Sequence, residues 1–335
     1  MNKIPLMAGL LTLVGACDAL GTSPFNGSTT DTTTTTTDTG TTSTANVPPG
    51  TTSPTPTDDI FRQEAQDATG AGYAEGFVYD SATDTFTIDG LAFDGDNTYA
   101  RDNVIASLGP FAVYESDATF TDSYNSEVVT QFVHRAIYGV STSGQSEFAI
   151  VRTGSYVGYG FGGFIYQRNG GVVLPTTGQA SYTGSYAGLR TFSGDTGLEY
   201  TEADVAIAID FEDFQNGGGV KGDVFNRRVY DLAGTDVTQD VIDAINVEFS
   251  SSLTTLPTMV FTVSPDIADA NGEIAGALTS EFIADDGTTV AFEDGSYYAI
   301  VSGDDAEEIV GVIVIESAGV NSITAQETGG FIVYR

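Results

Sequence analysis

The sequence predicts an all-β protein, and three observations lead to that fold class. Apolar and polar residues alternate on many short segments, as they do in half-buried strands. Glycine, aspartate and asparagine, which favour turns, separate these segments. Tyrosine and phenylalanine contribute 16 and 20 residues, and both favour strands. The 335 residues are enough for a large folded body beside a leader segment.

The first element is an export signal over residues 1–16. An apolar run from Leu6 to Val14 follows Lys3 and is too short to span a membrane. The residues Val14-Gly15-Ala16-Cys17 resemble a bacterial lipobox, which implies cleavage before Cys17 and acylation of its thiol. Cys17 is the chain's only cysteine, so it has no disulfide partner within the chain. The alternative is an ordinary secretory signal that ends near a cysteine.

Residues 17–58 are expected to form a disordered tether. They are mostly Thr, Ser, Gly, Asp and Pro, and almost none of their side chains can be buried. Burial therefore cannot offset the conformational entropy that ordering would cost. With Cys17 acylated, the tether becomes a stalk that holds the folded body off a lipid bilayer. Asp18 resembles the signal that retains some bacterial lipoproteins in the inner membrane, and it opposes a surface location.

The charge is strongly negative. Lys and Arg total 11 against 46 Asp and Glu, a net charge of −35. Such a chain repels nucleic acid and anionic lipid, so no nucleic-acid partner is expected. The acidity is typical of a solvated surface or a salty habitat, although it also suits a basic partner or metal cations.

The body contains thirteen segments with strand character. They are residues 77–79, 85–88, 111–114, 131–138, 147–152, 179–186, 203–211, 220–225, 259–263, 273–282, 296–301, 309–315 and 330–334. In 205–209 the larger side chains alternate with alanines, which predicts one packed face. Residues 309–315 are apolar on both faces and predict a central strand. Short helices are expected at 58–68 and at 237–245.

Two segments of the body echo each other. Residues 162–168 and 329–335 each begin with Gly-Gly, continue as an aromatic strand and end in arginine. A turn at 169–171 and Pro175 lie between the two units. We therefore place a boundary at residue 169, which gives a β-rich domain over 59–168 and a second domain over 169–335.

The second domain resembles a known family. A Tyr-x-Gly strand at 180–188, an Asp-Phe strand at 208–211, a glycine after the turn at 220–222, a Gly-x-Ile-x-Gly hairpin at 272–276 and the ending at 327–331 follow one another. This order is similar to the barrel domain of transferrin-binding protein B-like surface lipoproteins, a solute-binding family. The likeness covers residues 175–335.

The resemblance implies a small β-rich handle domain followed by an eight-stranded antiparallel β-barrel. It also implies an acylated, outer-membrane, surface-exposed protein that captures a solute or an extracellular protein beside an outer-membrane transporter, often for iron supply. Better-known members have two handle-barrel lobes, and this chain has room for one. No binding residue is carried over, because the matches are architectural.

Catalytic and metal sites have little support, so no catalytic residue, metal ligand or cofactor is predicted. His134 is the single histidine, and we expect it to be a surface or hydrogen-bonded strand residue. The Asp-rich turns at 94–97 and 302–305 lack the ligand spacing of a calcium loop. Carboxylate pairs suited to glycoside hydrolysis stay open as an alternative.

An aromatic run offers the best candidates for ligand contact. Tyr156, Tyr159 and Phe161 precede Phe164 and Tyr166 in a glycine-rich segment, and tyrosine is favoured in interfaces. The alternative is that these rings pack the seam between barrel and handle.

The sequence thus favours a non-catalytic, lipid-anchored envelope protein that captures a ligand. Two alternatives remain: a structural or adhesin-like acidic surface lipoprotein without a small ligand, and a carboxylate-based hydrolase.

Overall fold

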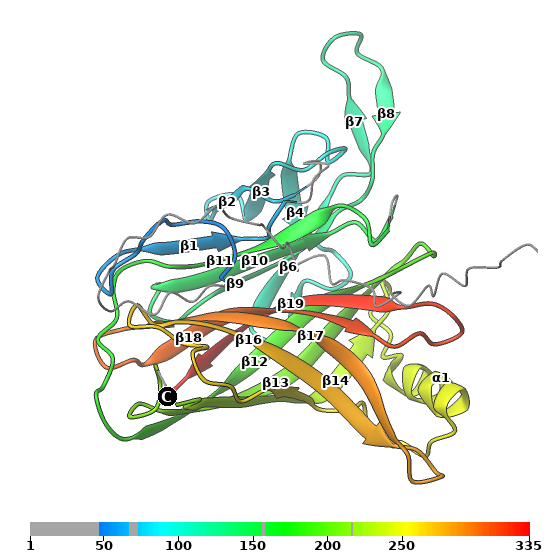
Figure 1. The fold of residues 1–335 in the computed structure, drawn as a ribbon. Helices are drawn as coiled ribbons and strands as arrows, with labels where there is room; N and C mark the ends of the chain where they lie inside the picture. Colours follow the sequence, from blue (N-terminus) through cyan, green and yellow to red (C-terminus); the bar gives the residue numbers. More distant parts are fainter. Residues whose placement is uncertain (1–46, 67–72, 156–157, 216) are drawn as a thin grey trace, which may run out of the picture. The chain divides into compact units, whose positions relative to one another are not determined.

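The computed structural model describes residues 47–66, 73–155, 158–215 and 217–335. The predicted signal peptide, Cys17, Asp18 and the tether up to residue 46 lie outside the described residues. Within the described part the chain forms a large sheet, a closed barrel, a small hairpin and one helix (Figure 1). The all-β class is confirmed. No helix in these ranges has the length and apolarity to cross a bilayer.

The second half of the chain closes into an antiparallel barrel of eight strands, as predicted. The strands are β12 (Gln179–Phe192), β13 (Leu198–Asp210), β14 (Val220–Tyr230), β15 (Met259–Phe261), β16 (Glu273–Ile283), β17 (Thr289–Ser302), β18 (Glu308–Ser317) and β19 (Ala325–Tyr334). Strand β12 pairs with β13 on one side and with β19 on the other, which closes the barrel.

The first half forms a nine-stranded sheet among the described residues. Its strands are β1 (Ile60–Gln63), β2 (Gly76–Asp80), β3 (Thr85–Asp89), β4 (Thr98–Arg101), β5 (Ser107–Leu108), β6 (Phe111–Ser116), β9 (Arg135–Val140), β10 (Ser146–Arg152) and β11 (Gly162–Arg168). A separate hairpin contains β7 (Thr119–Thr121) and β8 (Val128–Thr130). The domain boundary at residue 169 stays a prediction, and the turn between β11 and β12 spans it.

Of the two predicted helices, one is confirmed and one is wrong. Helix α1 runs over Thr238–Phe249 and buries Ile242 and Ile245. Residues 58–68 were expected to be helical, but Ile60–Gln63 form strand β1, which pairs with β11. Ile60 and Arg62 are buried alternately along this strand, so pairing and burial outweigh the weak helical pattern. Residues 47–58, assigned to the tether, contact β1: the Thr51 amide donates to the Phe61 carbonyl at 3.0 Å.

Two successive glycines let the sheet and the barrel approach closely. A Cβ at Gly330 would lie 2.2 Å from the Phe148 ring of β10, and a Cβ at Gly329 would lie 2.3 Å from the Tyr186 ring inside the barrel. Opposite faces of β19 therefore each receive an aromatic ring. In the second copy of the sequence echo, the Gly329-Gly330 pair has this packing role.

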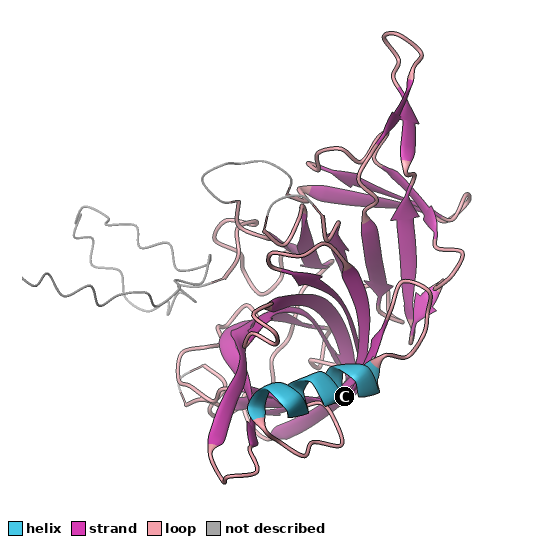
Figure 2. Cartoon of the chain, turned by 90° about the vertical axis from the view of Figure 1, so that its right-hand side faces the viewer, coloured by secondary structure: helices cyan, strands magenta, loops and turns pink. Residues whose placement is uncertain are grey.

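The barrel is weakest beside β15, and this places α1. Strand β14 pairs with β15 only at Asp223 and Val224, so from Phe225 onward the only strand that pairs with it among the described residues is β13. The chain between β14 and β15 includes α1, which lies at this end of the barrel (Figures 1 and 2). Ile245 of α1 packs with Phe282 and Phe292 of the barrel wall. This end of the barrel is called the α1 end below.

Candidate functional site

The barrel interior changes from apolar to charged toward the α1 end. Along β13 the buried side is occupied by Ile209, Ile207 and Val205, and then by Thr201 and the half-buried Glu199. Strand β19 likewise continues from Val333 and Phe331 to the buried Glu327. Successive inward positions lie two residues apart, so each strand extends one apolar face into a polar layer.

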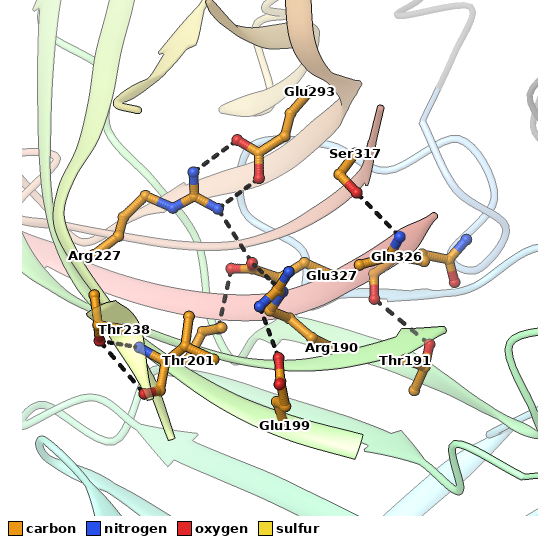
Figure 3. Close-up of polar contacts among 12 residues, drawn as sticks. Arg190, Thr191, Glu199, Thr201, Arg227, Thr238, Glu293, Ser317, Gln326 and Glu327 are labelled. Carbon is orange, nitrogen blue, oxygen red and sulfur yellow. Dashed lines mark hydrogen bonds and ion pairs between the residues drawn. The ribbon is translucent and has the colours of Figure 1, made fainter. Parts of the chain in front are cut away.

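Arg227 is the centre of this polar layer (Figure 3). Its guanidinium donates two hydrogen bonds of 2.7 Å to the two carboxylate oxygens of Glu293. A third hydrogen bond, of 3.2 Å, joins Nη2 to Oε2 of Glu327. Fork-shaped pairing of this kind holds both partners in a fixed geometry.

The layer continues from Glu327 to Arg190 and Glu199 (Figure 3). Oε1 of Glu327 accepts hydrogen bonds from the Tyr186 hydroxyl at 2.8 Å and the Thr201 hydroxyl at 3.0 Å. Arg190 lies 3.9 Å from Oε2 of Glu327 and donates to Oε2 of Glu199 at 2.7 Å. The layer therefore holds two arginines and three glutamates, which we call the charged layer: Arg190, Glu199, Arg227, Glu293 and Glu327.

An irregularity in strand pairing directs one residue of this layer inward. The register of β13 and β14 shifts between Glu202 and Asp204, and Arg227 lies at this shift on β14. A bulge reverses which residues of a strand point inward, and so it turns the side chain of Arg227 into the barrel. Glu293 needs no bulge, because it continues the inward alternation of Tyr297 and Ala299 along β17.

The pKa values in the layer follow from burial and pairing. Burial alone would raise the pKa of Glu293, but the charge and hydrogen bonds of Arg227 outweigh it and lower that pKa. Burial opposes the charge of Arg227, yet Glu293 and Glu327 raise its pKa above the usual value. Glu199 differs: burial raises its pKa, and Arg190 only partly offsets this effect. The charge of Glu199 is thus less compensated than that of Glu293.

A cavity of about 470 Å³ lies against the charged layer at the α1 end. Arg190 and Glu199 line it, together with apolar side chains of α1 and of the turn between β18 and β19. The apolar walls include Phe192, Val241, Ala244, Phe292, Val320 and Ile323. Its volume, and a lining that combines apolar walls with polar and charged groups, suit a small ligand.

The arrangement is suited to binding. The carboxylates of Glu293 and Glu327 are occupied by arginine and hydroxyl donors, which stabilises them as fixed negative charges. Groups fixed by such networks orient a ligand at little further entropic cost.

Of the predicted aromatic residues, Tyr159 lies beside the cavity's rim. Tyr159 is half-buried, and its hydroxyl lies 2.8 Å from the Thr324 hydroxyl, next to the cavity-lining Ile323. Burial raises the pKa of Tyr159 to about 12. Phe161 is half-buried, with its ring 6.0 Å from that of Phe93. Tyr156 lies outside the described residues. A ligand-binding role for the three stays a prediction.

The other aromatics of the run pack the seam, meaning the contact between the sheet and the outer face of the barrel. The ring of Phe164 stacks on that of Tyr298 at 6.1 Å, and Tyr166 is fully buried.

His134 is deeply buried, so the expected surface position is wrong and the hydrogen-bonded alternative holds. Its Nδ1 lies 3.1 Å from the Phe132 carbonyl, and its Nε2 has no hydrogen-bond partner in the described part of the chain. Burial lowers its pKa to about 4, which keeps the ring neutral. Across the described ranges, no group of three or more His, Cys, Asp or Glu residues is arranged to hold a metal ion.

Sequence reasoning missed the charged layer because its members come from five strands, and a bulge places Arg227. One local signal existed: Thr201 and Glu199 continue the inward alternation of Ile209, Ile207 and Val205. The predicted strand 203–211 begins after these two residues, so it does not include this signal.

No family model matches the chain, and no curated protein matches it. Solved structures do show similarity. A double mutant of transferrin binding protein B from Haemophilus parasuis Hp5 has 13% identity and a TM-score of 0.37, over 76% of this chain and 41% of that one. Isotype 1 transferrin binding protein B from serogroup B Neisseria meningitidis has 13% identity and a TM-score of 0.31, over 75% and 46%.

A crystal structure described as a surface lipoprotein has 14% identity and a TM-score of 0.27, over 58% of this chain and 79% of that chain. These proteins are of the kind that the sequence of the second domain resembles. The chain spans less than half of the length of the two transferrin binding proteins described above.

Proposed function

We propose that this chain is a non-catalytic, lipid-anchored envelope protein that captures a small ligand at the α1 end of its barrel. The single observation that carries the proposal is the cavity of about 470 Å³ against the charged layer. Apolar walls supply the affinity through burial, and the fixed charges of Arg190 and Glu199 supply orientation.

The proposed anchor is Cys17, acylated after signal cleavage, with the tether as a stalk. We place the protein in the outer membrane and on the cell surface, as the sequence resemblance implies. Anchoring restricts the barrel to a thin layer above the bilayer, which raises its effective concentration near an outer-membrane transporter of nutrients or iron.

Protease treatment of intact cells tests the location. Cutting in the tether should release the folded body from wild-type cells, and the Cys17→Ala variant should not be held at the cell surface. Protection of the wild type until the outer membrane is opened would contradict surface display and would favour inner-membrane retention through Asp18.

Capture is tested with the full chain carrying Cys17→Ala, immobilised and exposed to spent growth medium. Mass spectrometry of a solvent extract should show a small molecule enriched on this protein. The enrichment should be absent when Ala244→Trp is added, because this change fills the cavity from α1. Equal extracts from both proteins would favour a structural or adhesin-like surface role, and a chemically altered ligand would favour a hydrolase.

A further inference from the structure

The charge around the cavity restricts the ligand further than the proposed function does. Three carboxylates and one guanidinium line it, from Asp195, Glu199, Asp240 and Arg190, so the formal charge of the lining is −2. The chain as a whole carries −35. Both fields repel an anion and attract a cation.

The one arginine of the lining is not available to an anion. Arg190 already donates to Glu199 at 2.7 Å, and its side chain is only 12% exposed. An anionic ligand would have to displace Glu199 and leave that carboxylate without its countercharge, which is costly at a half-buried position.

Glu199 has capacity left for a cation. Its Oε2 accepts from Arg190, while its Oε1 has no hydrogen-bond partner among the described residues. The side chain is 24% exposed and lines the cavity, so this oxygen is accessible to a ligand. A charge-assisted hydrogen bond from an ammonium group would satisfy it.

The aromatic walls fit the same class of ligand. The Phe192 ring already has the Arg190 guanidinium 5.8 Å from its centroid, and Phe292 lines the cavity as well. Aromatic faces attract cations, and apolar walls exclude water from an apolar body.

We propose that the cavity binds an amphipathic amine, with its apolar body between α1 and the β18–β19 turn and its ammonium group on Oε1 of Glu199. This proposal rests on the proposed capture function and names the chemical class of the ligand.

Three probes with one ring system test the class: 1-naphthylmethylamine, 1-naphthylmethanol and 1-naphthoate. Each is titrated calorimetrically into the full chain carrying Cys17→Ala. The amine should bind about 10-fold or more tightly than the alcohol, because a hydrogen bond between charged groups is stronger than a neutral one. The carboxylate should bind most weakly.

Variants locate the binding. Ala244→Trp should weaken amine binding about 10-fold or more by filling the cavity, and Ile323→Trp repeats the test from the opposite wall without touching the helix. Val247→Trp is the matched control on α1, since Val247 is 82% exposed and should leave binding unchanged. Glu199→Gln should remove the preference for amine over alcohol.

The outcomes separate the two proposals. If the carboxylate binds most tightly and this binding is lost when the cavity is filled, the amine class is overturned. The cavity then remains the capture site. If none of the three probes shows saturable binding, both the ligand class and the cavity as the capture site are overturned. The same holds if neither cavity-filling variant alters amine binding.

Discussion

The part of the chain that the structure describes buries arginine in two places, and the two clusters differ in what lies next to them. The seam buries Arg62, Arg152 and Arg168, which are 5%, 4% and 0% exposed. The α1 end holds Arg190 and Arg227 in the charged layer. Basic residues are few in this sequence, which has 11 lysines and arginines in all.

At the seam the arginines join elements far apart in the sequence. Arg62 forms two hydrogen bonds to Glu273, of 2.6 and 2.7 Å, and Arg152 donates to Glu64 and to the Thr328 hydroxyl. Arg168 donates to backbone carbonyls, including that of Val301 at 2.9 Å. These contacts fix the sheet on the barrel wall.

At the α1 end the same chemistry borders a cavity, and Glu199 keeps an acceptor for a ligand. The comparison shows that buried ion pairs alone do not indicate a functional site. The site differs from the seam because a cavity lies next to it and because Oε1 of Glu199 still has room for a hydrogen bond.

The largest expected effect comes from removing one arginine from each cluster. Arg62→Met leaves Glu273 buried without its partner, and Arg227→Met does the same to Glu293, so each should lower the free energy of unfolding by about 3–5 kcal/mol. Urea denaturation measures this loss. Only Arg227→Met should also weaken binding of 1-naphthylmethylamine.

The control is Arg335→Met, whose partner Asp305 has a 75% exposed side chain and whose removal should have little effect on stability. A loss at Arg62 no larger than that of the control would contradict the structural role assigned to the seam.

His134 is a buried ionisable group with no countercharge, unlike either cluster. Its pKa is about 4 in the folded chain against 6.5 for an unperturbed histidine, so the unfolded chain binds the proton first as the pH falls. Stability should therefore decrease between pH 6.5 and 4, by about 3 kcal/mol from this residue. Comparing urea denaturation of wild type and His134→Leu across this range isolates the contribution. Parallel pH curves for the two proteins would refute it.

A smaller effect is expected where aromatic packing supports the seam. Gly330→Ala places a methyl group against the Phe148 ring and should destabilise the fold by about 1–3 kcal/mol. Thermal unfolding measures this. Adding Phe148→Leu should cost less in the Gly330→Ala background than in the wild type, because the smaller side chain relieves the clash. Additive losses would show that the two residues do not contact.

The smallest effect on stability is expected at Glu199. Its side chain is 24% exposed, so Glu199→Gln should change the free energy of unfolding by less than about 1 kcal/mol. A large drop in stability would instead assign Glu199 a structural role like that of Glu273. Urea denaturation run beside the probe titrations makes that distinction.

Local patterns were enough to predict much of the fold. The alternation in 205–209 and the apolar run in 309–315 appear as the alternately buried β13 and the fully buried part of β18. The closed barrel was implied by the family that the order of motifs in the second domain resembles. Strand β1 was missed because four residues carry little periodicity, and only its pairing with β11 makes it a strand.

The site depended on information that no short segment contains. Arg227 points inward at a register shift, and a bulge is set by the partner strand as much as by the residues that form it. The cavity depends on α1 covering a barrel end where β14 and β15 pair over two residues each. Such placement is a tertiary property, which an aromatic run within one segment does not reveal.

Hydrogen exchange in the presence of 1-naphthylmethylamine tests the central claim most directly, because it compares the two regions in one experiment on the full Cys17→Ala chain. The account predicts slower exchange in α1 (Thr238–Phe249) and in the turn between β18 and β19, with β10 and β11 at the seam unchanged. Slower exchange at the seam, or no change at the α1 end under saturating probe, would contradict it.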